Sequence, residues 1–306
     1  MNKAGYRWNK NKLQLFLLAL PFVLYILLFN YVPLFGWVYA FFDFRPGVPL
    51  GKVPFAGFKY FQMAFDFKSG SELLQVFRNT LALSFLGILT TPLPVVFAIC
   101  LSEMNNRFCK KFVQTFTTLP NFISWILVYA IAFATFSIND GFLNHILLGL
   151  NWIKEPVNPL ANGSIAWLFQ TALSIWKSLG FNSIIYLAAI GGIDSEMYDA
   201  ADIDGAGRFK KILHVTVPGI APTYIVLLLL AVSNILSNGF DQYYAFMNAM
   251  VREQIQVFDY YIYRVGLGLN EYSLGTALGM FKSVVSIILL FSVNQAAKRI
   301  RGEPII

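Results

Sequence analysis

The chain has 306 residues, of which 57% are hydrophobic and 17% aromatic, whereas only 13% carry a charge. This composition is far more apolar than that of an ordinary soluble domain and predicts a polytopic membrane protein. The formal net charge of +7 does not indicate a nucleic-acid-binding protein, because the basic residues stand in short clusters beside apolar runs and form no continuous basic face.

Six apolar segments are long enough to cross a bilayer as helices, which takes roughly 20 residues each. The first segment follows a basic stretch, but it is too long for the apolar part of a signal peptide, so we expect it to remain as a membrane helix. We therefore predict an all-α polytopic membrane protein in which residues 1–306 form a single transmembrane domain. The expected spans are residues 13–42, 77–101, 112–136, 165–192, 217–237 and 272–295.

Lysine and arginine gather on one side of these spans, whereas the opposite connections mix basic with acidic residues. Because cytoplasmic connections are enriched in Lys and Arg, we expect both termini and the connections after the second and fourth spans to lie in the cytoplasm. The residues that carry this prediction are Lys3, Arg7, Lys10, Lys12, Arg107, Lys110, Lys111, Arg208, Lys210, Lys211, Lys298, Arg299 and Arg301.

A long polar and charged stretch, residues 194–222, separates the fourth and fifth spans. A polar cap at position 194 or 195 and the good helix formers that follow predict a short helix over residues 195–203. Asp204-Gly205 predicts a turn, and residues 208–214 predict a second short helix with solvated basic side chains. The stretch is therefore expected to be a cytoplasmic helix-turn-helix that contacts another molecule in water.

The same stretch resembles the EAA loop of the membrane subunits of ATP-binding-cassette importers. The family pattern is Glu-Ala-Ala, a glycine four residues after the second alanine, and then Ile-x-Leu-Pro. The chain departs from it at Asp199, which is one methylene shorter than glutamate, and at two aliphatic positions, Val215 and Val217. The coupling residues that the resemblance implies are Asp199, Ala200, Ala201, Gly205 and Pro218.

This resemblance implies a permease whose residues 193–216 dock into a cleft of a cytoplasmic ATPase. No P-loop is present in the sequence, so ATP and Mg²⁺ are expected on that partner chain and no cofactor on this one. A second related permease, giving a heterodimer, and an extracytoplasmic substrate-binding protein are also implied. The expected location is the cell membrane of a prokaryote.

Two further patches are similar to the sugar-importing branch of these permeases, and they make a carbohydrate the leading substrate class. They are Phe55-Ala56-Gly57-Phe58-Lys59-Tyr60-Phe61 and Phe77-Arg78-Asn79-Thr80. A third patch, which starts at Gly279, resembles permeases for polysaccharides and complex oligosaccharides. The same architecture importing amino acids or peptides stays open as an alternative.

Polar and aromatic residues inside the expected spans are candidates for the substrate path, because transport sites commonly lie near the midplane. Amides and hydroxyls can bond sugar oxygens, and aromatic faces can pack on sugar rings. Ser and Asn also bond across packed helices, and Trp also lies in interface belts, so a purely structural role stays open for each. The candidates are Trp176, Asn182, Ser233, Asn234, Asn238 and Lys282.

Lys282 differs from the other candidates because it is charged. It follows Glu271 by eleven residues, which is roughly 16 Å along a helix and close to mid-bilayer. A charge there costs on the order of 2.5–3.5 kcal/mol and needs water or a partner. Lys282 is therefore expected either to face the substrate or to form an internal ion pair with an acid.

A membrane enzyme is the more distant alternative, and the sequence shows none of the expected equipment. His145 and His214 are far apart in the sequence, and neither belongs to a His-Glu-x-x-His motif. No Gly-x-Ser-x-Gly motif occurs. We therefore expect a transport subunit and neither a catalytic nor a metal site.

Overall fold

The computed structural model describes residues 10–65 and 71–301. In those residues the secondary structure is helical, and the β-type pairing is an isolated bridge between Phe42 and Phe55. The all-α prediction is confirmed. The chain divides into two compact units, Met1–Asp66 with Ile262–Phe281 and Phe67–Tyr261 with Lys282–Ile306. Lys3 and Arg7, which contribute to the predicted orientation, lie outside the described residues.

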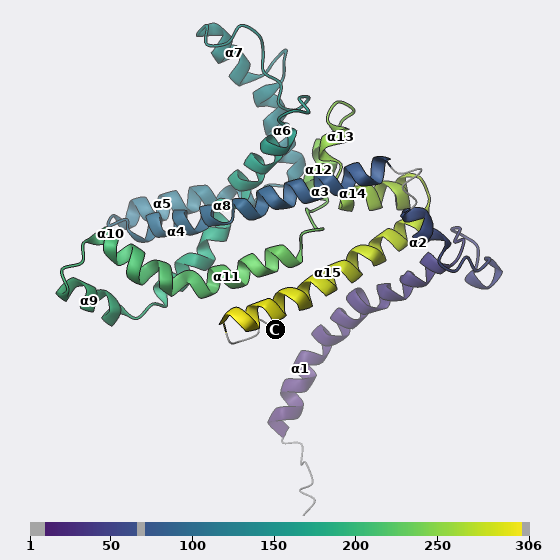
Figure 1. Cartoon of the computed structure of the whole chain (residues 1–306), viewed down its shortest axis with the longest axis horizontal. Helices are drawn as coiled ribbons and strands as arrows, with labels where there is room; N and C mark the ends of the chain where they lie inside the picture. The colour runs from purple at the N-terminus through teal and green to yellow at the C-terminus, as the bar shows by residue number, and fades with distance from the viewer. Residues whose placement is uncertain (1–9, 66–70, 302–306) are drawn as a thin grey trace, which may run out of the picture. The chain divides into compact units, whose positions relative to one another are not determined.

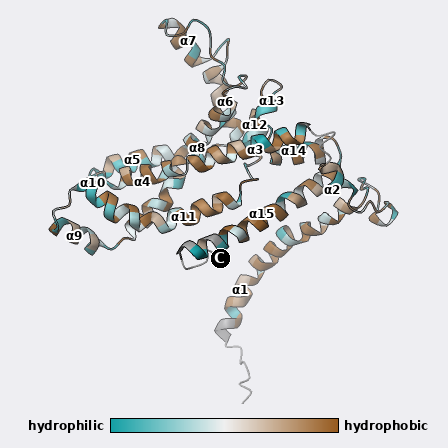
Figure 2. Cartoon of the chain, in the orientation of Figure 1, coloured by the Kyte–Doolittle hydropathy of each residue, from teal (hydrophilic) through white to brown (hydrophobic). Residues whose placement is uncertain are grey.

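The first unit contains a long N-terminal helix and a small cap, residues 42–64. Helix α1 (Lys10–Ile26) continues through the π-helical turn Leu27–Tyr31 into the 3-10 segment Val32–Phe41. The cap holds the short helix α2 (Lys59–Ala64), and the first part of α15 (Tyr272–Arg301) belongs to the same unit. Figure 1 labels the helices, and Figure 2 shows α11 and α15 mainly in apolar colours.

Hydrogen bonds from two residues hold this cap together. The Ser273 hydroxyl donates to the Phe42 carbonyl at 2.7 Å and accepts from the Phe44 N–H at 3.0 Å. The Tyr60 hydroxyl donates to the Asp43 carboxylate at 2.7 Å. This bond, together with Arg45 and Lys59, lowers the pKa of Asp43, whereas burial and then the bond to Asp43 raise the pKa of Tyr60 to about 12.

The second unit holds most of the spans and is built around one long helix. This helix, α8 (Ala166–Gly191), packs against α3 (Ser71–Leu89), α4 (Pro92–Ser102), α5 (Arg107–Thr118) and α11 (Val217–Ser233). The remaining α-helices of this unit are α6 (Trp125–Phe136), α7 (Phe142–Gly149), α9 (Ser195–Ile203), α10 (Arg208–Lys211), α12 (Asp241–Phe246), α13 (Arg252–Ile255), α14 (Phe258–Tyr263, ending in the first unit) and the second part of α15, from Lys282 on.

Among the described residues, five helices are long and apolar enough to cross a membrane. They match five of the six expected spans. They are Leu13–Phe41, Glu72–Ser102, Ala166–Gly191, Arg208–Ser233 and Tyr272–Arg299. The third expected span, residues 112–136, is not one straight helix, because Arg107–Phe122 and Trp125–Phe136 meet at an angle of 105°.

Lys177 on α8 explains how this break is tolerated inside an apolar region. Its ammonium donates to the carbonyls of Pro120, Asn121 and Ile123 at 3.2, 2.7 and 2.7 Å, and it lies 5.5 Å from the centre of the Trp125 ring. These carbonyls are the groups that a helix end leaves without intrahelical partners, and a cation there is favoured by the helix dipole. On the other side of the break, the Ser124 hydroxyl caps α6 by accepting from Leu127 N–H.

The Asn79-Thr80 pair, which suggested the sugar branch, has a structural task here. Both side chains are fully buried. Asn79 donates to the Glu253 carbonyl at 2.8 Å, and the Thr80 hydroxyl accepts from Phe258 N–H at 2.9 Å. The pair therefore fixes the connection between α13 and α14 on helix α3.

Candidate functional site

The helix-turn-helix is present, and local sequence explains its first half. The Asp194 carboxylate caps α9 by accepting from Glu196 N–H at 3.0 Å. At the other end Gly205 has φ +70°, a conformation that costs side-chain-bearing residues energy. Ala206 N–H then bonds to the Ala201 carbonyl at 2.9 Å, as in the glycine-based ends of many helices.

The second predicted short helix, residues 208–214, is wrong as a separate element. Helix α10 continues through the π-helical turn Ile212–Thr216 into α11, so Arg208–Ser233 is one helix. Pro218 is the second residue after that turn. A proline cannot donate to the carbonyl one turn earlier, and a widened π-turn is a common way for a helix to accommodate such a gap.

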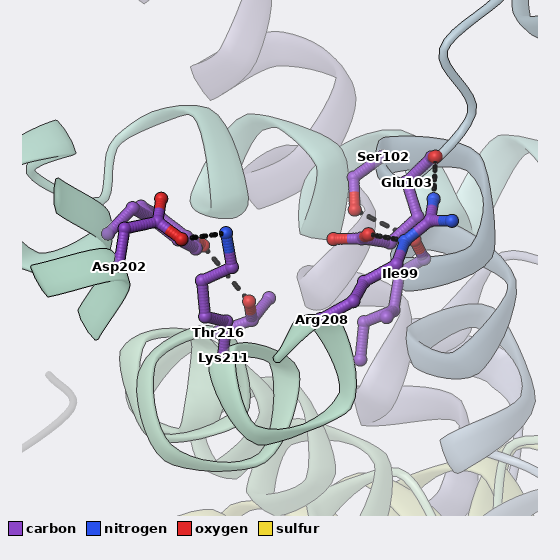
Figure 3. Close-up of polar contacts among 8 residues, drawn as sticks. Ile99, Ser102, Glu103, Asp202, Arg208, Lys211 and Thr216 are labelled. Atoms are coloured by element: carbon purple, nitrogen blue, oxygen red, sulfur yellow. Dashed lines mark hydrogen bonds and ion pairs between the residues drawn. The ribbon is translucent and has the colours of Figure 1, made fainter. Parts of the chain in front are cut away.

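Three polar contacts hold this loop, which we call the coupling loop (residues 193–216). Figure 3 shows Arg208 beside Glu103 at the end of α4, where it bonds both the carboxylate and the backbone carbonyl. Lys211 pairs with Asp202 at 2.8 Å across the turn. Tyr198 and Thr216 share a hydrogen bond of 3.0 Å between their hydroxyls.

The coupling loop borders an open hollow of about 520 Å³ and exposes large apolar side chains. Ala200 and Ala201 line the hollow, where their small size leaves room for an inserted group. Ile203 and Phe209 are 86% and 77% exposed, and Met197 and Leu213 are about half exposed. Asp199 and Pro218 are exposed and do not line the hollow. The sequence analysis missed Ile203 and Phe209, although large apolar residues in a connection that is predicted to be solvated indicate a contact surface.

A second hollow, of about 320 Å³, lies within the second unit between α3, α4, α8, α11 and the chain that follows α11. Three of the six candidate path residues line it, namely Asn182, Asn234 and Asn238. We call it the amide cavity. Its other polar lining residues are Ser84, Thr90, Thr91, Gln170, Thr171, Ser174, Ser178, Ser237, Gln242 and Tyr243, and none of the described lining residues is charged.

The other three candidates lie elsewhere. Ser233 is buried and its hydroxyl donates to the Leu229 carbonyl at 2.9 Å within α11. Trp176 is 45% exposed on α8 and does not line the amide cavity. Lys282 forms an ion pair with Asp259 on α14, so of the two alternatives from the sequence the internal pair is the one observed.

Sequence reasoning missed the contribution of helices α3 and α4 to this cavity. Thr90 and Thr91 stand where α3 ends and α4 begins, ahead of Pro92 and Pro94. The two prolines lack N–H groups and favour an interruption there, and irregular backbone at membrane depth commonly lines a cavity or is covered by protein. A Thr-Thr-Pro-x-Pro sequence inside an apolar run was therefore an available signal.

An all-α chain with several membrane-length helices, a polar cavity among them and a polar helix-turn-helix between two of them has the architecture of a membrane transport subunit. The chain belongs to the family described as binding-protein-dependent transport system inner membrane component, whose model matches residues 91–302. It is thus a permease of the ATP-binding-cassette importer type and not an enzyme, and it is a multi-pass membrane protein of bacterial kind.

Curated relatives and solved structures agree with this assignment over nearly the whole chain. The chain is 38% identical to protein LplB of Bacillus subtilis over 290 residues, which cover 94% of this chain and 90% of the relative. It is 36% identical over 292 residues to the polygalacturonan/rhamnogalacturonan transport system permease protein YteP of the same species, with coverage of 95% and 89%.

A chain in the crystal structure of a bacterial importer of the acidic polysaccharide alginate is also similar. It superposes with a TM-score of 0.84 at 32% identity, and the match covers 95% of this chain and 97% of that one. A second structure of the bacterial alginate transporter, in complex with a periplasmic protein that carries an alginate pentasaccharide, gives the same TM-score and identity.

Proposed function

We propose that this permease forms half of the path for an oligosaccharide or polysaccharide fragment, and that the amide cavity is its binding region. The neutral, hydroxyl-rich and amide-rich lining carries this proposal. Sugar hydroxyls both donate and accept hydrogen bonds, as the lining Asn, Gln, Ser and Thr side chains do. The names of the relatives, which include polygalacturonan and arabinooligosaccharide permeases, support the same class.

The amide cavity argues against an amino acid or peptide as the cargo. A zwitterion or charged terminus moved out of water needs a charged or strongly bonding partner. The described residues that line the cavity supply no charge. Only contacts outside this cavity could bind such a cargo.

The coupling loop is proposed as the dock for a separate cytoplasmic ATPase, which would hold ATP and Mg²⁺. The exposed Ile203 and Phe209 would become buried on docking, at roughly 25 cal/mol for each Å² of apolar surface removed from water. A second related permease would complete the path. An extracytoplasmic binding protein would deliver the sugar, as the complex of the alginate importer with its periplasmic protein suggests by analogy.

A reconstituted complex tests the substrate class. The chain, its partner permease and the ATPase would be purified together, placed in liposomes with the cognate binding protein, and assayed for ATP hydrolysis. We expect stimulation by an arabinooligosaccharide, which is uncharged like the lining of the amide cavity, and none by a tripeptide. Stimulation by the peptide alone would contradict the proposal.

A further inference from the structure

Asp259 on α14 bonds two different partners with its two carboxylate oxygens. Oδ1 contacts the ammonium of Lys282 on α15, and Oδ2 accepts from Gly239 N–H at 3.2 Å. The side chains of Lys282 and Asp259 are only 20% and 15% exposed. A charge pair with so little access to water keeps its geometry when its remaining lone pairs are also bonded, and here Gly239 supplies that further bond.

Position 239 favours glycine because of its backbone angle and not because a side chain would lack space. Its φ is +87°, in the region that glycine occupies at little cost. A side chain added there would meet no atom within 4 Å. The turn therefore depends on the backbone angle and on the bond to Asp259, and both determine how residue 238 is presented to the amide cavity.

The hydrogen bonds around Asn238 fix which way its amide is turned. The Ser84 hydroxyl donates its single hydrogen to the Ile235 carbonyl at 2.5 Å, so toward Asn238 it can only accept. The Asn238 nitrogen therefore faces Ser84, at 2.8 Å. The Asn238 carbonyl oxygen is left as a buried acceptor with no hydrogen-bond partner in the described part of the chain.

We infer that Asp259 and Lys282 are positioning residues for the transported sugar. Lys282 holds Asp259, Asp259 holds the Gly239 turn, and the turn presents the carbonyl oxygen of Asn238 as an acceptor for a substrate hydroxyl. This inference rests on the proposed function for the identity of the donor. Its structural part, the control of the Gly239 turn by an acceptor at position 259, stands apart from the identity of the cargo.

Two double variants separate positioning from a simple ion pair. Asp259→Asn with Lys282→Met removes both charges but keeps an acceptor for Gly239 N–H. Asp259→Leu with Lys282→Met removes both charges and the acceptor at nearly the same side-chain size. Neither strands a charge, and neutral replacement of a buried pair is often tolerated, so both complexes are expected to assemble. Asp259→Ala with Lys282→Met is a second variant without an acceptor and without added bulk.

The readout is the rate at which a small methanethiosulfonate reagent labels Ser237→Cys, which lines the amide cavity beside Asn238. The two native cysteines, Cys100 and Cys109, are exposed and would be changed to serine. We expect the asparagine variant to label like the parent, and the leucine and alanine variants to differ by about fivefold or more, the factor of roughly one hydrogen bond.

Equal labelling rates in the asparagine and leucine variants would overturn the inference, whether both match the parent or both depart from it. No sugar is present in this assay. A failure of the carbohydrate proposal would therefore show in the liposome assay, and a failure of the positioning inference would show here.

Discussion

Lys177 is the residue whose removal is expected to cost most, because a single ammonium serves three backbone carbonyls. Lys177→Met would leave these acceptors without a donor in a site where the side chain is 8% exposed. We expect a loss of several kcal/mol, seen as a lower melting temperature and a lower yield of the purified complex. Lys177→Arg should recover part of the loss, and Lys154→Met, at an exposed position, is the control. A melting temperature unchanged in Lys177→Met would contradict this account.

Tyr60 and Asp43 give the cap a predictable response to alkaline pH. The pKa of Tyr60 is raised from 10.0 to about 12 in the folded chain. A raised folded pKa means that its stabilising contribution is complete below pH 10.0 and is lost as the pH rises through about 12. Tyr60→Phe removes this contribution, so the variant cap should be the weaker one at neutral pH and should lack the additional alkaline loss.

Hydrogen exchange of peptides that cover residues 42–60 measures this, at neutral pH and again after alkaline incubation. Asp43 shifts in the opposite direction, since its lowered pKa means that its contribution is present above pH 3.8 and is lost in more acidic solution. Parallel alkaline curves for parent and variant would refute the assignment to Tyr60.

At the level of elements, the turn of the coupling loop offers two glycines for a matched comparison. Gly205 has φ +70°, whereas Gly207 has φ −65° and can accept a side chain. In Gly205→Ala, the left-handed turn should become less stable by about 1–2 kcal/mol, which lowers the affinity for the ATPase about tenfold. Gly207→Ala should leave this affinity nearly unchanged. Co-purification of the ATPase at increasing salt, together with uptake, would show the difference. Equal behaviour of the two variants would remove the turn from the coupling mechanism.

The elements that sequence predicts well are those whose signal is local. The start of α9, the turn at Gly205 and the positions of the long apolar helices follow from caps, glycine and hydropathy over neighbouring residues. The break at Ile123 does not, because its stabilising group, Lys177, is 54 residues further along the chain. The amide cavity is intermediate: its asparagines stand out inside apolar spans, but Ser84 and Thr90 look like ordinary helix residues until distant segments meet.

For the whole molecule, the orientation in the membrane is still a prediction from the distribution of Lys and Arg. Cysteines at Asn162 and Ala249 should react with a membrane-impermeant thiol reagent in intact cells, and a cysteine at Lys210 should not. The neighbouring Asn248 is a poorer choice than Ala249 for a cysteine, because its side chain donates to the Leu160 carbonyl at 2.9 Å and the loss of this bond would disturb the loop. Ser69, an obvious third position, lies outside the described residues. The reverse labelling pattern would show that the topology is inverted and that the coupling loop lies on the side of the membrane without ATP.

The bond between Lys177 and the broken third span has a consequence for biosynthesis. The carbonyls at positions 120 and 123 leave the ribosome 57 and 54 residues before the lysine that satisfies them. Until then the break exposes bare acceptors, and α8 when it arrives carries a charge near the middle of an apolar helix, which alone would cost about 2.5–3.5 kcal/mol to insert. The broken third span and α8 are therefore each expected to insert poorly alone and better as a pair, when Lys177 can bond the carbonyls of the break. Stepwise release of single helices would therefore be slower than joint release of the pair.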